Sequence, residues 1–164
     1  MLHRMADRDT SVTDDLVCFA LYAASRSVTA VYRPLLERLD LTYPQYLVMM
    51  LLWHHGESGV KELGSELRLD YGTVTPLLKR LETLGYLRRQ RRVDDERAVR
   101  VSLTEAGAAL RERAGEIPLH ITEALGLTTA QTATLLELLG TIIDNTTRYA
   151  DSPPARPASE PRTG

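Results

Sequence analysis

Cysteine is almost absent from this 164-residue chain, in which Cys18 is the only one. A single cysteine cannot form a disulfide within the chain, so any disulfide requires a second molecule. A reducing compartment would keep the side chain as a thiol. The composition therefore leaves two interpretations of Cys18, a buried structural residue or a reactive thiol.

Long hydrophobic runs are also missing. The longest, "YLVMMLLW" at residues 46–53, has about half of the roughly 20 apolar residues that a membrane-spanning helix needs. The first residues, "MLHRMADRDTSVTDD", contain no apolar stretch behind their charges and do not resemble a signal peptide. We therefore expect no membrane span and a cytoplasmic protein.

The chain has no excess of positive charge, with 20 Lys and Arg against 22 Asp and Glu. This balance argues against a protein that is basic throughout, although nucleic-acid binding needs only a local basic face. With 43% hydrophobic residues the composition is that of a globular protein, long enough for one sizeable core. The proline-rich end, residues 151–164, has no large apolar residue and is expected to be disordered.

Apolar periodicity predicts a mainly helical chain. A first helix is expected to begin near residues 11–14, to run past Tyr32, and to kink or end at Pro34. A second helix follows the capping residue Thr42 and stops at Gly56. Because this second helix is apolar around its circumference, we expect it to be deeply buried.

The next segment predicts a helix-turn-helix with a wing. It reads as a short helix at residues 60–67, a turn at "RLDYG", and a longer helix ending at Leu84. Alternation in "AVRVSL", after a basic stretch and an acidic turn, predicts a two-stranded hairpin. The longer helix carries apolar residues at spacings of three and four, which predict its core-facing stripe: Val74, Leu77, Leu78, Leu81 and Leu84.

Two capping signals mark the last predicted helices. Thr104 caps a helix that begins "TEAGAALRERAGEI", and Thr128 with Gln131 forms a capping-box pattern before the final helix. The final helix has a broad apolar face, which we expect to pack on a second subunit. That face contains Leu135, Leu136, Leu138, Leu139, Ile142 and Ile143.

Positive charge is concentrated around the predicted wing. Residues 76–100 contain eight Lys and Arg against four Asp and Glu, a net charge of +4. Such a surface can bind phosphates, and the helix before it fits the major groove. Thr73 and Thr75 lie near the start of that helix, where base edges or phosphates are within reach. Arg97 at the hairpin tip suits the minor groove, with Asp95 as a possible orienting partner. A solvated charged face on a helical bundle is the alternative.

These residues resemble a known family. The segment "LDYGTVTPLLKRLETLGYLRRQRRVDDERAVRVSLTEAG" resembles the winged-helix core of the MarR family of bacterial transcription regulators. The segment "CFALYAASRSVTAVYRPLLERLDLTYPQYLVMMLLW" resembles the OhrR-type sensors of organic hydroperoxides. The resemblance covers residues from about 15 to 150. It implies a mainly α fold with a small β-wing, a winged helix-turn-helix assembled as a MarR-like homodimer.

The resemblance also implies a function. A homodimer of this type represses a peroxide-resistance gene and leaves its double-stranded operator DNA when its N-terminal cysteine is oxidised. That role falls on Cys18, with Tyr22, Tyr32 and Tyr43 as the surrounding phenols. Tyr71 departs from the family pattern, where a small hydroxyl residue is more usual. The matching DNA-contact positions are Asp70, Gly72, Thr73, Thr75, Lys79, Arg80, Arg89, Asp95 and Arg97.

Peroxide sensing needs a thiolate, which is the nucleophile that attacks the O–O bond. Asp14 and Asp15, one turn before Cys18, would raise the thiol pKa if they faced it, whereas phenols that donate hydrogen bonds to sulfur would favour the thiolate. Tyr22 is one turn away, but fourteen residues of helix place Tyr32 about 21 Å from Cys18. The predicted site therefore lies between two antiparallel first helices of different subunits.

The apolar neighbours of Cys18, which are Leu16, Phe19 and Leu21, favour an organic hydroperoxide over hydrogen peroxide. Oxidation should change the contacts at the subunit interface and the spacing of the two wings, which must match half-sites about one DNA turn apart. Because the chain has no second cysteine, it resembles the one-cysteine sensors. A lasting change then requires a mixed disulfide with a low-molecular-weight thiol, or overoxidation.

Three classes of function remain open on the sequence. They are a redox-sensing repressor, a MarR-type regulator that responds to a phenolic ligand, and a thiol peroxidase, which the missing resolving cysteine disfavours. His54 and His55 are a poor ligand set for a metal. We therefore expect a regulator rather than an enzyme, with no metal and no cofactor.

The expected organisation has five parts. Residues 1–12 are a flexible N-terminus, and residues 13–58 contain helices for dimerisation and sensing. Residues 59–104 form the winged helix-turn-helix, residues 105–150 contain further dimerisation helices, and residues 151–164 are the disordered tail.

Overall fold

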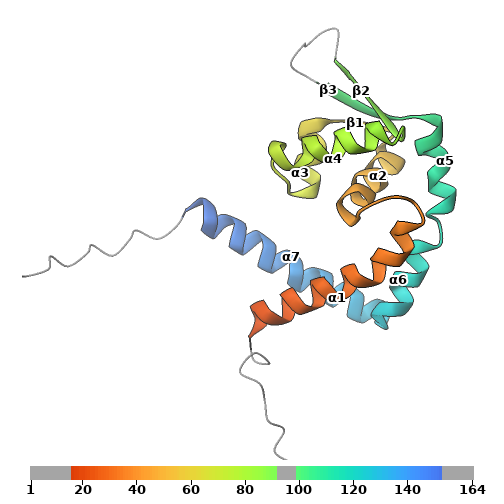
Figure 1. Cartoon of the computed structure of the whole chain (residues 1–164). Helices are drawn as coiled ribbons and strands as arrows, with labels where there is room; N and C mark the ends of the chain where they lie inside the picture. Colours follow the sequence, from red (N-terminus) through yellow and green to blue (C-terminus); the bar gives the residue numbers. More distant parts are fainter. Residues whose placement is uncertain (1–15, 92–98, 153–164) are drawn as a thin grey trace, which may run out of the picture. The chain divides into compact units, whose positions relative to one another are not determined.

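The structure is a computed structural model that describes residues 16–91 and 99–152. It is mainly helical, with one small antiparallel sheet, as the sequence predicted (Figure 1). Its contacts divide the chain into two compact units, with the boundary between Leu125 and Gly126. The first unit contains every described element except the last helix, α7.

Helix α1, Val17–Glu37, runs past Tyr32 as predicted. The described helix begins at Val17 after an extended Leu16, without a side-chain cap, and the predicted start at residues 11–14 lies outside the described residues. Pro34 does not end the helix, which continues to Glu37. The missing N–H of Pro34 costs one backbone hydrogen bond, and burial of Leu36 in the core holds the last turn in place.

Helix α2, Tyr43–His55, confirms the expected central helix. The side chain of Gln45 accepts the Thr42 backbone N–H at 2.8 Å, which completes the helix start. Gly56, at φ 83°, ends the helix in a backbone conformation that suits glycine. Val48, Met49 and Leu52 have no exposed surface, because α2 contacts α1, α3, α4, α5 and two strands.

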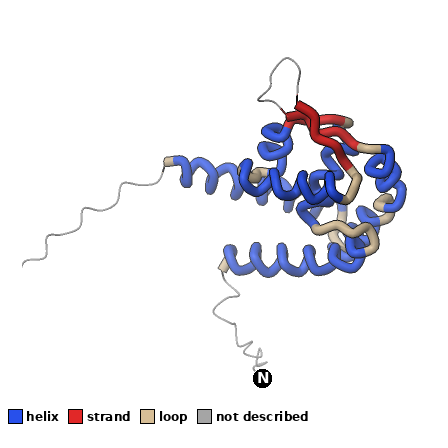
Figure 2. The backbone as a smooth tube through the Cα atoms, turned by 45° about the horizontal axis from the view of Figure 1, so that its top comes forward, coloured by secondary structure: helices blue, strands red, loops and turns tan. Residues whose placement is uncertain are grey.

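The winged helix-turn-helix follows. Helices α3, Val60–Leu67, and α4, Tyr71–Thr83, precede strands β2, Leu87–Arg91, and β3, Val99–Leu103. A third strand, β1, Glu57–Gly59, was missed because three residues are too few for an alternation pattern. The three strands lie side by side in the order β1-β3-β2 (Figure 2).

The predicted stripe of α4 is confirmed. Val74, Leu78 and Leu81 have no exposed surface, and Leu77 and Leu84 are half-buried against the same core. They pack with Leu63 of α3 and Val101 of β3. The stripe therefore fixes which side of α4 remains available on the surface.

Helix α5, Glu105–Arg113, begins at the predicted cap, where the Thr104 hydroxyl accepts the Gly107 N–H at 3.0 Å. The helix ends earlier than "TEAGAALRERAGEI" suggested, and a separate helix α6, Ile117–Leu125, packs against α1. Gly115 lies in this break, and Pro118 is the second residue of α6. Burial of Ile117 and Ile121 is what holds α6 in the first unit.

The second unit contains α7, Thr129–Asp151. The predicted capping box is confirmed, since Gln131 Oε1 accepts the Thr128 N–H at 2.9 Å and Thr128 Oγ1 accepts the Gln131 N–H at 3.3 Å. No residue of α7 is buried, and its packing on a second subunit stays a prediction. Among the described residues, no helix is both long and apolar enough to cross a membrane. The exposed large apolar residues of α7 are Leu135, Leu136, Leu138, Ile143 and Tyr149.

Candidate redox site and nucleic-acid interface

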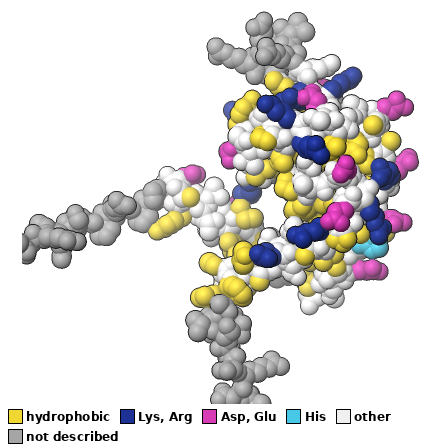
Figure 3. Space-filling model, in the orientation of Figure 1, with side chains coloured by type: hydrophobic (Ala, Val, Ile, Leu, Met, Phe, Trp, Pro, Cys, Tyr) yellow, Lys and Arg dark blue, Asp and Glu magenta, His cyan; other side chains and the backbone are white. Residues whose placement is uncertain are grey.

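Cys18 is the second residue of α1, and its side chain is exposed. Its apolar neighbours are exposed as well, with Val17 64% and Phe19 42% accessible. In the space-filling view, hydrophobic side chains gather on the surface where α1 begins (Figure 3). Cys18 is therefore not a buried structural residue within this chain, and the thiol is open to a reagent.

Tyr22 lies one helical turn after Cys18 and contacts a cation that the sequence reasoning missed. The hydroxyl of Tyr22 accepts a hydrogen bond from Arg26 Nη1 at 3.0 Å, and the Arg26 guanidinium lies 5.6 Å from the centre of the Tyr22 ring. The spacing of four residues puts Cys18, Tyr22 and Arg26 on one face of α1. Because the Tyr22 oxygen accepts from Arg26, its own hydrogen remains for another acceptor.

The structure brings two other predicted phenols together. The ring centres of Tyr32 and Tyr43 are 4.6 Å apart, and Tyr46 lies 5.9 Å from Tyr32. Trp53 extends this series at 6.1 Å from Tyr46. Tyr46 and Trp53 were not identified from the sequence, although the spacing of three between Tyr43 and Tyr46 was a usable signal.

Burial and the neighbouring Tyr43 and Tyr46 raise the pKa of Tyr32 to about 12. Burial also raises the pKa of Tyr46. Tyr32 therefore keeps its proton at neutral pH and remains a hydrogen-bond donor. A cavity of about 330 Å³ lies beside Tyr32 and Tyr43, with Leu36 and Leu41 in its wall.

Cys18 lies near the start of α1, whereas Tyr32, which contacts Tyr43 of α2, lies toward the end of the same helix. The helix is continuous from Val17 to Glu37, so the fourteen-residue separation corresponds to about 21 Å along its axis. One chain does not bring Cys18 to Tyr32.

At the start of α4, Asp70 and Thr73 are joined by two hydrogen bonds. Asp70 is the N-cap, and its carboxylate accepts both the Thr73 N–H and the Thr73 hydroxyl at 2.9 Å. These hydrogen bonds keep the pKa of Asp70 below its usual value. Gly72 is exposed beside them, and a Cβ there would lie 3.0 Å from Asp70 Oδ1. Tyr71 projects next to them with 69% of its surface accessible.

The other predicted contacts of α4 differ in exposure. Lys79 and Arg80 are exposed and have no ion pair with another described residue. The Thr75 hydroxyl is buried, without a hydrogen-bond partner among the described residues. Thr75 adjoins the buried residues Val74 and Leu78 on the helix, which keeps this group off the surface, and its contact with DNA stays a prediction.

In the wing, Arg89 of β2 forms hydrogen bonds with Glu82 of α4, which we call the recognition helix because it is the helix predicted to enter the major groove. Its guanidinium donates to Glu82 Oε2 at 2.9 Å from Nε and at 2.7 Å from Nη2. Its backbone N–H donates to Glu82 Oε1 at 3.0 Å. This contact, which joins residues on either side of a turn, was not predicted. Asp95 and Arg97, the predicted wing-tip residues, lie outside the described residues.

Hydrogen bonds join the start of α5 to α2, which carries Tyr43 and Tyr46, and to the turn that follows α4. Trp53 Nε1 of α2 donates to the Gly107 carbonyl at 2.8 Å. The Thr104 hydroxyl donates to the Gly85 carbonyl at 2.6 Å. A Cβ on Gly107 would lie 1.8 Å from the Tyr86 carbonyl oxygen, so only glycine permits this approach.

Comparison with known proteins decides the family. The profile described as "Transcriptional regulator SarA/Rot" matches residues 30–113. The organic hydroperoxide resistance transcriptional regulator of Bacillus subtilis is 52% identical over 105 residues, which cover 64% of this chain and 71% of that protein. The chain belongs to the MarR family of winged-helix transcription regulators. It is accordingly a regulator rather than an enzyme.

Two solved MarR-type structures are similar to this chain. AbfR of Staphylococcus epidermidis, solved bound to DNA in a reduced form, is 31% identical with a TM-score of 0.70, over 80% of this chain and 91% of AbfR. AbfR has also been solved bound to DNA in an overoxidised form. BpsR of Bordetella bronchiseptica, whose DNA binding is regulated by 6-hydroxynicotinic acid, is 26% identical with a TM-score of 0.72, over 79% of this chain and 94% of BpsR.

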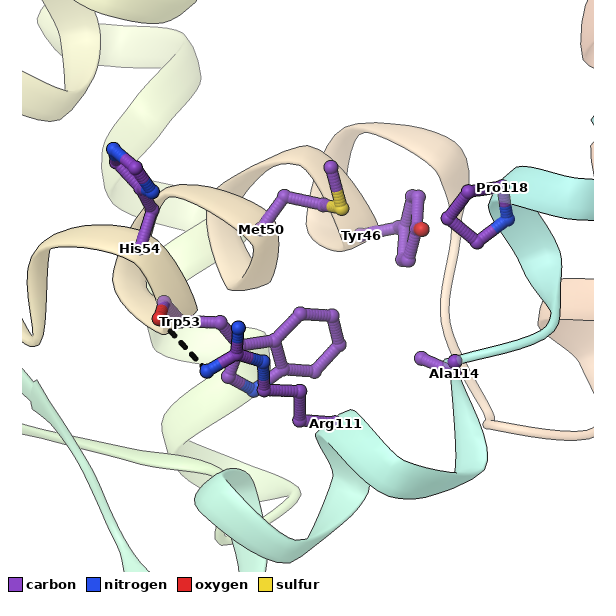
Figure 4. Close-up of a pocket in the computed structure, with 8 residues that line it drawn as sticks. Tyr46, Met50, Trp53, His54, Arg111, Ala114 and Pro118 are labelled. Atoms are coloured by element: carbon purple, nitrogen blue, oxygen red, sulfur yellow. Dashed lines mark hydrogen bonds between the residues drawn. The ribbon is translucent and has the colours of Figure 1, made fainter.

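This MarR-family chain has a further cavity, of about 260 Å³, between α2 and α5 (Figure 4). Tyr46, Met50 and Trp53 of α2 form an apolar wall, and Arg111 reaches from α5 to place its guanidinium beside Trp53. Arg111 Nη1 lies 3.5 Å from the Trp53 carbonyl oxygen, at the long limit for a hydrogen bond. The cavity combines an aromatic surface with one cation.

No metal site is found in the part of the chain that the structure describes, where no three His, Cys, Asp or Glu side chains gather. His55, considered as a ligand above, instead pairs with Glu66 through Nε2 at 3.1 Å. Its ring stacks edge-on against His54.

Proposed function

We propose that this chain is a cytoplasmic redox-sensing repressor that binds operator DNA as a homodimer. Oxidation of Cys18 by an organic hydroperoxide releases the DNA and derepresses a peroxide-resistance gene. The observation that carries the proposal is the division of the site along α1. An exposed thiol lies near the start of this helix, and Tyr32, whose pKa is raised by burial, lies toward its end in ring contact with Tyr43 of α2.

Two antiparallel copies of α1 would bring these halves together. Cys18 of one subunit would then face Tyr32 and Tyr43 of the other, and each dimer would contain two sites. Exposed apolar side chains around Cys18 and along α7 support such a dimer, since their burial favours association. Residues 13–58 and 105–150 would provide the dimer surfaces, and residues 59–104 the DNA-binding part.

The chemistry follows from the donors. Phenolic O–H groups that donate to sulfur favour the thiolate. The thiolate attacks the terminal oxygen of the hydroperoxide, the O–O bond breaks, and the alkoxide leaves with the electron pair and takes a proton to become an alcohol. Cys18 becomes a sulfenic acid. A low-molecular-weight thiol then displaces hydroxide, which leaves as water, and forms a mixed disulfide.

Arg26 would orient Tyr22 in this site. Its guanidinium occupies an acceptor position of the phenol, which directs the remaining hydrogen away from Arg26. The apolar residues at the start of α1 and the cavity beside Tyr32 favour an organic peroxide over hydrogen peroxide.

A series of contacts could also couple the redox site to the DNA-binding helices. Tyr32, Tyr43, Tyr46 and Trp53 form a continuous series of ring contacts, and Trp53 donates to Gly107, which abuts the corner between α4 and β2. We infer that displaced phenols shift α5 and change the spacing of the two recognition helices, which must match two half-sites.

A gel-shift assay tests the proposal. The probe is a duplex enriched from a random-sequence pool by the reduced wild-type protein. Cumene hydroperoxide should release the wild-type protein at concentrations where hydrogen peroxide does not. Cys18→Ser should bind the duplex and ignore both oxidants, and Tyr32→Phe should respond more slowly. Unaltered wild-type binding after cumene hydroperoxide would contradict the proposal.

A second candidate is regulation by an aromatic acid. The cavity beside Trp53 has an apolar wall for a ring and Arg111 for a carboxylate, and BpsR is a relative whose DNA binding responds to such an acid. In the same assay salicylate would then release both wild type and Cys18→Ser, and Arg111→Gln would weaken the response. A salicylate response that requires Cys18 would exclude this alternative.

A further inference from the structure

Three cations predicted to contact DNA are presented differently by the structure. Lys79 and Arg80 on α4 are exposed and form no ion pair with another described residue. Arg89 on β2 is half-buried, with 26% of its side chain accessible, and is paired with Glu82. The difference separates cations available to phosphates from one that is already neutralised.

The sheet turns Arg89 toward the interior. Side chains alternate along a strand, so Arg89 shares a face with Leu87, which is 2% exposed. Its cross-strand partner Val101 has no exposed surface and lies on the same face. Arg88 and Gln90 occupy the opposite face and are exposed.

Glu82 also satisfies the backbone of an edge strand. Among the described residues, strand β2 pairs with β3 alone, which leaves its outward N–H groups without a strand partner there. Glu82 accepts one of them, the Arg89 N–H, at 3.0 Å. One carboxylate therefore accepts three hydrogen bonds from a single residue, and they keep the pKa of Glu82 below its usual value.

The corner between α4 and β2 is closed by backbone hydrogen bonds. The Tyr86 N–H donates to the Leu81 carbonyl and the Gly85 N–H to the Glu82 carbonyl, both at 3.0 Å, with Gly85 at φ 77°. This pattern is a Schellman motif, which fixes how the chain leaves the helix. The contact between Glu82 and Arg89 extends the constraint three residues further, into the wing strand.

We propose that Glu82 is a positioning residue for DNA binding, which holds the wing against the recognition helix through Arg89, and that Arg89 makes no phosphate contact. Two guanidinium donors of Arg89 are already bound to Glu82, and the charge of the side chain is paired, so it attracts a phosphate less than Lys79 and Arg80, which are exposed and unpaired among the described residues. The pair instead sets the angle at which the outward-facing cations of the wing meet the DNA backbone. This inference rests on DNA binding by the MarR-family fold and does not depend on the oxidation of Cys18.

Salt dependence separates positioning from phosphate contact. Affinity for the enriched duplex is measured by fluorescence anisotropy over a range of KCl concentrations, for wild type, Glu82→Gln, Arg89→Gln and the double variant. The slope of log K against log[KCl] becomes less steep by about 0.9 for each phosphate contact that is lost. Arg80→Gln, an exposed cation on the same helix, is the matched control and should reduce the slope.

We expect Arg89→Gln and Glu82→Gln each to weaken binding about tenfold with an unchanged slope, and the double variant to be no weaker than either single variant. Active concentrations are set by stoichiometric titration far below the unfolding temperature, so a residue that only stabilised the fold would not change affinity. A shallower slope for Arg89→Gln would overturn the proposal. Additive losses, or unchanged affinity in both single variants, would overturn it as well.

Discussion

The first turns of α1 and the winged helix-turn-helix differ in how much of their apolar side chains is exposed to solvent. Leu16, Val17 and Phe19 are between 42% and 64% exposed, whereas Leu63 and Leu78 have no exposed surface at all. The winged region buries its core within one chain. The start of α1 leaves apolar residues and a thiol exposed, which the proposed dimer would cover.

The largest expected effects test this difference in burial. Leu78→Ala should lower the free energy of unfolding by about 2–5 kcal/mol, because it removes a fully buried side chain and leaves a cavity. Phe19→Ala should cost less than about 0.5 kcal/mol in the monomer and should instead weaken dimerisation. Urea unfolding at several protein concentrations measures both. If Phe19→Ala lowered the free energy of unfolding by the same amount at every protein concentration, the difference in burial between the two regions would be contradicted.

Gly107 offers a second contrast. Gly107→Ala should destabilise the protein by about 1–3 kcal/mol, since its Cβ would collide with the Tyr86 carbonyl oxygen. A Cβ on Gly140 of α7 would meet nothing within 4 Å, so Gly140→Ala should stabilise its helix by up to about 1 kcal/mol. Thermal unfolding compares them, and a similar loss from both would show that α7 is as tightly enclosed as α5.

The N-caps of α5 and α7 should differ less in their contribution to the free energy of unfolding. Thr104→Ala should cost between about 1 and 2 kcal/mol, because it removes the cap of α5 and the hydrogen bond to Gly85. Thr128→Ala, which removes only the local cap of α7, should cost nearer 0.5 kcal/mol, roughly the low end for such caps. Thr104→Ser keeps both hydrogen bonds and serves as the control. Equal losses at Thr104 and Thr128 would argue against a special role for the contact with Gly85.

The smallest expected effect on the free energy of unfolding at neutral pH comes from the ionisation of Tyr32. Folding raises its pKa from 10.0 to about 12, so the folded state favours the protonated phenol. Its contribution is fully present below pH 10 and is lost as the pH rises toward 12. Wild type should therefore lose stability relative to Tyr32→Phe above pH 10, with a pH-independent difference from pH 7 to 9. Denaturant unfolding across this range measures it, and parallel curves up to pH 12 would contradict the burial of Tyr32.

Local signals predicted much of the fold. The stripe of α4 followed from spacings of three and four, and the caps at Thr104 and Thr128 from side-chain chemistry. Strand β1 was missed because its three residues gain their conformation from pairing with β3. The break between α5 and α6 depends on the burial of α6 side chains against α1, although Gly115 and Pro118 in the sequence indicated that the helix could be interrupted there.

Less of the candidate site could be predicted. Tyr22 and Arg26 are four residues apart, so their contact was accessible from helical spacing. The ring contacts of Tyr32 with Tyr43 and Tyr46 join α1 to α2, so they depended on how the two helices pack. The pair of Glu82 and Arg89 depends on a turn whose geometry the sequence does not specify at side-chain level.

Strand β3 lies between β1 and β2, yet it is the last of the three along the chain. During synthesis, β1 and β2 leave the ribosome before the strand that both require, and neither pairs with the other. The sheet can therefore form only after Leu103 has emerged, late in translation for a unit that ends at Leu125. Until then the edges of β1 and β2 remain open, and substitutions in β3 should raise the yield of aggregated protein more than equally buried substitutions in α2.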